Sequence, residues 1–103
     1  MFSDEAREKV QDAVLAELAN ATKYYGREYH SLHEGYAVLL EEVEEAADNL
    51  EYIKKNMDVL WQSIKSNDLS ETVLLTDIEG TAQMLALEAV QIAAVCTKFK
   101  RGM

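Results

Sequence analysis

The chain has 103 residues, the length of one ordinary domain, and residues 1–103 are expected to form a single all-α domain. Proline is absent, glycine occurs only four times and 49% of the residues are hydrophobic, which argues against a turn-rich β fold and against disorder. The 19 acidic and 10 basic residues give a formal net charge of -9. Binding to nucleic acid polymers is therefore disfavoured, because it requires basic side chains that neutralise phosphates.

The first expected helix spans residues 3–25. Ser3 is suited to the N-cap, and the acidic residues that follow it favour the positive end of a helix. Val10, Val14 and Leu18 recur at steps of four and place an apolar stripe on one face. Gly26 is a natural stop just beyond the end of this helix.

The second expected helix spans residues 31–66, either straight or with a bend at Lys54, Lys55 and Asn56. Ser31 and Glu34 form the Ser-x-x-Glu capping box, in which each side chain accepts a hydrogen bond from a free backbone amide. Apolar residues then recur at alternating steps of four and three, the pattern of a helix packed against a partner helix. This apolar stripe consists of Leu32, Tyr36, Leu39, Val43, Ala46, Leu50, Ile53, Met57, Leu60 and Ile64. A turn is expected at residues 66–68.

The third helical region begins after Ser70 and forms either one long helix or two pieces broken near Gly80. Residues 84–96 are apolar on nearly every side, so this stretch is expected to be buried. It is too short, and at Glu88 and Gln91 too polar, for a membrane span. With a single cysteine and no leader segment, a cytoplasmic location is expected.

These elements predict an antiparallel bundle of three to four long helices. Three helices with this much apolar surface cannot bury all of it within one chain of this length. We therefore expect a homodimer, or a higher homo-oligomer, to complete the bundle.

Two pairs of oxygen-bearing side chains are candidates for a metal site. Glu42 and Glu45 are three residues apart and so share one helix face, and Glu88 and Gln91 have the same spacing in the apolar third region. A buried carboxylate requires a proton, a partner or a cation, and Mg²⁺ prefers carboxylate, amide and water oxygens. The alternatives are a solvated acidic face around Glu42 and a hydrogen-bonded or ion-paired Glu88 in the core.

Two windows resemble the MazG-like, all-alpha nucleoside triphosphate pyrophosphohydrolases, especially their small phage and prophage members. These windows are HEGYAVLLEEVEE at residues 33–45 and LEAVQIAAVC at residues 87–96. The Glu-x-x-Glu motif of that family falls on Glu42 and Glu45, and the first position of its Glu-x-x-Asp motif falls on Glu88. The chain departs from the pattern at Gln91, where the family usually has Asp.

The resemblance implies an enzyme that requires Mg²⁺, or Mn²⁺, and cleaves ribo- or deoxyribonucleoside triphosphates between the α and β phosphates. The products are a nucleoside monophosphate and pyrophosphate. It also implies that Glu42, Glu45, Glu88 and Gln91 are the metal ligands. Glu41 is the candidate catalytic group that activates the attacking water.

Three further residues are candidates for binding the substrate. Lys54 and Lys98 can contact phosphates, and Trp61 can stack on a base, although helix capping, solvation and packing are the ordinary roles of such side chains. The competing interpretation of the whole chain is a non-catalytic, acidic helical module for oligomerisation or protein interaction. That interpretation accounts for the long regular stripe and for Gln91.

Overall fold

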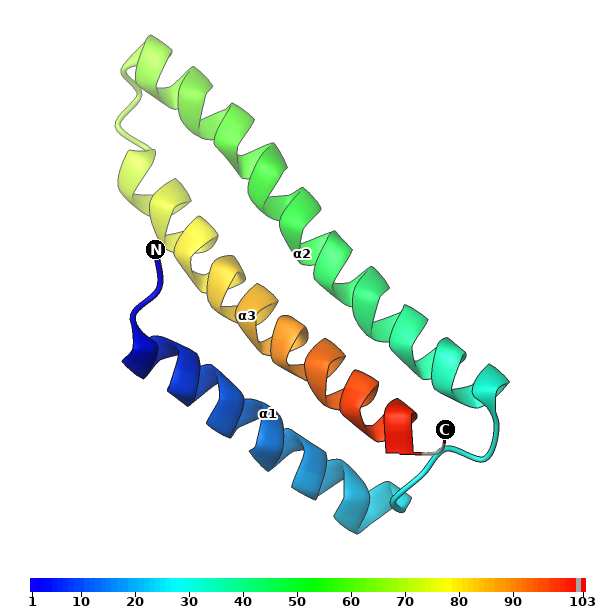
Figure 1. Cartoon of the computed structure of the whole chain (residues 1–103). Coiled ribbons are helices and arrows are strands. Elements are labelled where there is room, and N and C mark those ends of the chain that lie inside the picture. Colours follow the sequence, from blue (N-terminus) through cyan, green and yellow to red (C-terminus); the bar gives the residue numbers. More distant parts are fainter. Residues whose placement is uncertain (102) are drawn as a thin grey trace.

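The protein consists of three helices joined by two short connections (Figure 1). The computed structural model describes residues 1–101 and 103. The helices are α1 (Asp4–Tyr25), α2 (Leu32–Ser66) and α3 (Glu71–Arg101), and the described residues contain no strand. The predicted all-α class is thus confirmed.

The helix ends follow local capping rules. The Ser3 side chain accepts a hydrogen bond from the Ala6 amide, and Gly26, with a φ of 86°, ends α1 in a conformation that suits glycine. Ser31 accepts from the amide of Glu34, whose carboxylate in turn accepts from His30, one residue earlier than the expected capping box. The predicted starts and ends are therefore confirmed to within about a residue.

Both long helices are continuous. Helix α2 runs unbroken through residues 54–56 and ends at Asn67, which adopts a left-handed conformation with a φ of 55°. Helix α3 runs unbroken through Gly80, so the alternative of two separate pieces is wrong. Absence of proline allows helices of 35 and 31 residues, and packing of one against the other stabilises that length.

Helix α3 lies between the other two helices (Figure 1). Helix α2 packs antiparallel to α3 along most of its length, while α1 lies beside the C-terminal half of α3 on the opposite side. Within the described residues α1 and α2 do not pack against each other. Among the described residues, the buried hydrophobic side chains are Leu18 of α1 and Ala94 and Val95 of α3. The molecule is an open layer of helices, 55 × 32 × 23 Å, rather than a closed bundle.

The apolar stripe of α2 is only half covered by α3. Leu39, Ala46, Ile53 and Leu60 of that stripe are half-buried, but the residues at Tyr36, Val43, Leu50, Met57 and Ile64 remain exposed. The other positions facing α3 are small or polar, namely Gly35, Glu42, Asn49, Asn56 and Ser63. Helix α2 is therefore rotated so that Glu42, rather than the full apolar stripe, faces its neighbour.

Burial along residues 84–96 is uneven. Ala94 and Val95 are buried, but Met84 and Leu87 are exposed, so the expectation that this whole stretch is buried is wrong. The physical reason is that α1 covers only the C-terminal half of α3 (Figure 1). Helix α3 is long and apolar enough to cross a membrane if length and composition alone are considered, a test that core helices of soluble proteins also pass.

Candidate metal centre and adjoining cavity

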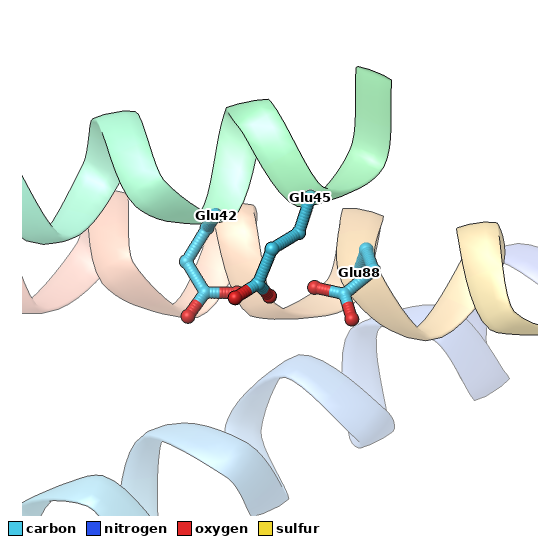
Figure 2. A group of neighbouring side chains, drawn as sticks. All are labelled: Glu42, Glu45 and Glu88. Carbon is cyan, nitrogen blue, oxygen red and sulfur yellow. The ribbon is translucent and has the colours of Figure 1, made fainter. Parts of the chain in front are cut away.

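Three carboxylates from two helices meet between α2 and α3. Glu42 and Glu45 project from adjacent turns of α2 toward Glu88 on α3 (Figure 2). One oxygen of each carboxylate lies within 4.8 Å of the others. Glu42 and Glu88 are half-buried, and Glu45 is exposed. Glu42 and Glu45 lie on one face of α2, as their spacing predicts. Glu88 of α3 lies beside them.

The electrostatics of this cluster favour a proton or a cation. Burial, followed by the charge of Glu45 and the proximity of Glu88, raises the pKa of the Glu42 carboxyl to about 7. A hydrogen bond with Glu88 and the charge of Glu88 raise the pKa of Glu45 as well. Three carboxylates held this close repel one another at neutral pH, and a divalent cation relieves that repulsion more completely than one shared proton.

The oxygen atoms present fit such a cation. The Oε2 atom of Glu88 is buried and accepts no hydrogen bond from any described residue. A buried oxygen without a partner is costly unless a ligand or water occupies the remaining space. Carboxylate oxygens are the preferred ligands of hard divalent cations. Glu42, Glu45 and Glu88 can therefore hold one such ion.

A cavity of about 430 Å³ adjoins the carboxylates and is bounded by all three helices. One part of the cavity lining is polar and consists of the carboxylates of Glu34, Glu41 and Glu42 and the amide of Gln91. Aromatic and aliphatic side chains complete the lining, namely Ala21, Tyr25, Tyr29, Val38 and Val95. This mixture of apolar surface and a few convergent polar groups is typical of small-molecule sites.

Lys98 contributes the one ammonium group of the cavity lining within the described residues. Its side chain is only 3% exposed, and the Nζ atom lies 4.4 Å from the centre of the Tyr29 ring. No carboxylate among residues 1–101 and 103 lies within ion-pairing distance of it. A buried ammonium held only by an aromatic face retains its capacity to bind an anion that enters the cavity.

Gln91 lies at the edge of the same cavity but is engaged with α1. Its Nε2 atom donates a hydrogen bond of 2.7 Å to Oε2 of Glu17. The side-chain oxygen of Gln91 is left to act as an acceptor or a ligand. This hydrogen bond links α3, which carries Glu88, to α1.

The remaining predicted site residues separate into two groups. Glu41 lines the cavity beside Glu42, as its predicted role in activating water requires. Lys54 is exposed and pairs with Glu51 at 3.8 Å, and the exposed Trp61 ring lies 5.5 Å from Nζ of Lys65. Lys54 and Trp61 lie twelve and nineteen residues beyond Glu42, or about 18 and 28 Å along the helix. Within one chain, neither residue reaches the cavity.

Sequence reasoning missed Glu17 and Glu34 as parts of this region. The sequence pattern marks Glu34 only as a capping residue, and its place on the cavity depends on the path of residues 26–31. Glu17 follows Val14 by three residues and precedes Ala21 by four, so it lies on the apolar side of α1. A carboxylate at such a position was the available clue that α1 contributes polar groups to the site.

No protein-family model, curated protein or solved structure matches this chain. The resemblance to MazG-like enzymes therefore depends on the two sequence windows alone. The structural features that bear on function are the carboxylates, the cavity and Lys98.

Proposed function

We propose that this protein is a Mg²⁺-dependent, MazG-like hydrolase that cleaves nucleoside triphosphates between the α and β phosphates, releasing a nucleoside monophosphate and pyrophosphate. The observation that carries the proposal is the meeting of Glu42, Glu45 and Glu88 within 4.8 Å beside a cavity that contains a buried lysine. Carboxylates for a metal and an ammonium for phosphate, placed side by side, are what phosphoanhydride hydrolysis requires.

The carboxylates have complementary tasks in this proposal. Glu42, Glu45 and Glu88 hold the cation, with the Gln91 oxygen as a fourth donor. Mg²⁺, or Mn²⁺ in its place, would supply charge neutralisation for the phosphate oxygens and would lower the pKa of the attacking water. Glu41 accepts the proton of that water, because it lines the cavity and lies next to Glu42 in the chain. One water is consumed and one phosphoanhydride bond is broken, and pyrophosphate is the leaving group.

The cavity accounts for recognition of the remainder of the nucleotide. Lys98 binds a phosphate oxygen, and the buried position of its ammonium strengthens that contact relative to one at the surface. Tyr25 and Tyr29 supply aromatic surface in the same cavity, where a base can stack. Burial and the charges of Glu34 and Glu42 raise the pKa of Tyr29, so its phenol stays protonated and can donate a hydrogen bond.

The direct test is pyrophosphate release from a panel of ribo- and deoxyribonucleoside triphosphates with Mg²⁺. We expect release by the natural protein, loss of release in Glu88→Gln, and retention in the matched control Glu44→Gln, whose side chain is exposed outside the cluster. Binding of Mn²⁺, followed by electron paramagnetic resonance, separates metal binding from turnover. A folded protein that binds the metal but releases no pyrophosphate from any member of the panel contradicts the proposal.

The exposed apolar residues of α2 favour a second candidate function, a non-catalytic module for helical assembly. In that case the carboxylates serve solubility, and neither Mg²⁺ nor nucleotides raise the melting temperature. A ligand that binds only the folded state must raise it, so thermal denaturation with each ligand distinguishes the two functions.

A further inference from the structure

One column of apolar residues on α2 stays about half exposed in the part of the chain that the structure describes. Tyr36, Val43, Leu50, Met57 and Ile64 recur every seven residues, and each is between 43% and 62% exposed. A strict seven-residue apolar column along a helix of this length is typical of a helix that packs against another helix. We propose that this column, here named the outer column, packs antiparallel against the outer column of a second copy of the chain.

The exposed area is large enough for such an interface. The chain exposes 7795 Å², whereas a folded monomer of 11.6 kDa exposes about 5,800 Å², so the excess is about 2,000 Å². A standard stable interface buries about 800 Å² from each partner, and permanent homodimers bury more. The radius of gyration is 17.5 Å, whereas a compact domain of this length has about 13 Å. The single chain is therefore also more extended than a compact domain. Pairing along α2 converts the open layer into a thicker bundle.

Charge selects the antiparallel orientation. Residues 32–51 of α2 contain seven carboxylates and no lysine or arginine, whereas residues 52–66 contain three lysines and one aspartate. A parallel pair places the two acidic halves side by side. An antiparallel pair places each acidic half against the basic half of the other copy, so the repulsion becomes an attraction.

Full overlap of the two outer columns sets the register of this two-fold pair. The outer column extends from Tyr36 to Ile64 with Leu50 at its centre, so Leu50 lies on the axis and meets its own copy. Val43 then meets Met57 of the second copy. The same register places Lys54 of each copy level with residues 44–48 of the other.

The first test is the mass in solution of the natural protein and two variants. We expect the natural protein at twice 11.6 kDa, Leu50→Glu at the single-chain mass with its helical circular dichroism retained, and Leu75→Glu still at twice that mass. Leu75 is the matched control because it is as exposed as Leu50, 52% against 49%, but lies on α3. A natural protein at the single-chain mass, or a Leu50→Glu protein that remains dimeric, overturns the proposal.

The second test uses disulfides and decides the case even if Leu50→Glu fails to fold. In a Cys96→Ser background, Leu50→Cys should crosslink two chains, because the two copies of this residue face each other across the axis. Val43→Cys and Met57→Cys alone should not crosslink, whereas an equal mixture of the two should. Crosslinking of Val43→Cys to itself indicates a parallel pair, and no crosslinking at any of these positions excludes the interface.

Discussion

Gln91 of α3 donates a hydrogen bond of 2.7 Å to Glu17 of α1, at the edge of the cavity that adjoins the carboxylate cluster. An aspartate, which the MazG-like pattern has at this position, cannot donate such a bond at neutral pH. The amide therefore does two things that an aspartate cannot do together: it keeps a further negative charge from the cluster, and it holds α1 beside α3.

Gln91→Asp is expected to lower the stability of the metal-free protein and to tighten Mg²⁺ binding. The substitution removes a hydrogen bond to a charged group and sets two carboxylates against each other, at a cost of about 1 to 2 kcal/mol. The added charge should raise Mg²⁺ affinity by about tenfold. Thermal denaturation with and without Mg²⁺ measures both effects. Addition of Glu17→Gln should restore the metal-free stability, and a double variant no more stable than Gln91→Asp would show that the two residues are not coupled.

The stability of the metal-free protein should depend on pH through Glu42. Its pKa is about 7 in the folded protein and 4.5 when unperturbed, so between these values the folded state binds more protons than the unfolded state. Stability from this group is therefore full below pH 4.5 and is lost as pH rises through 7. Because solvent reaches the cluster, the loss amounts to about 1 kcal/mol.

Melting temperatures across this pH range in the presence of a chelator measure that loss. Glu42→Gln should be less sensitive to pH and more stable than the natural protein at pH 8, whereas Glu44→Gln should follow the natural protein. Saturating Mg²⁺ should also remove the fall in stability, because the cation takes the place of the proton. A Glu42→Gln protein with the natural pH profile would contradict this assignment.

Lys98→Met is expected to weaken nucleotide binding while leaving stability unchanged or improved. Methionine preserves most of the buried aliphatic stem but removes an ammonium that has no ion-pair partner among the described residues. A charge-assisted hydrogen bond to phosphate contributes about 1.5 to 3 kcal/mol, so KM should rise by about 10- to 100-fold. Steady-state kinetics measures the change, with the exposed Lys100→Met as the control. An unchanged KM in Lys98→Met would exclude the cavity as the phosphate site.

Most of the fold was predictable because its determinants are local. Ser3, Gly26 and Ser31 mark helix ends through hydrogen bonds and backbone preferences that involve only adjacent turns. The rotation of α2 was not predictable in this way. Periodicity identifies the apolar stripe, but a second helix covers one side of it, and here that side includes Glu42 instead of Leu50.

The same distinction applies to the candidate site. The spacing of Glu42 and Glu45 fixed their common face, and the apolar surroundings of Glu88 marked it as unusual, so the cluster followed from residues near in sequence. The contribution of Glu17 depends on where α1 lies against α3, which no local pattern determines. Trp61 and Lys54 have plausible chemistry, but the length of a straight helix keeps them from the cavity of their own chain.

Gly35 sets how closely the start of α2 approaches the end of α3, next to the cavity. A Cβ atom at this position would lie 2.8 Å from two ring atoms of Phe99, which itself packs edge-on against Tyr29 at 6.1 Å. Gly35→Ala should therefore destabilise the protein by about 1 to 3 kcal/mol, because the ring must move out of its packed position.

Gly80→Ala is the matched control, since its Cβ meets no atom within 4 Å. That substitution should stabilise the protein by about 0.5 to 1 kcal/mol through the helix preference of alanine alone. Chemical denaturation of both variants measures the difference, and equal stabilisation by the two alanines would mean that Phe99 does not occupy this position in solution.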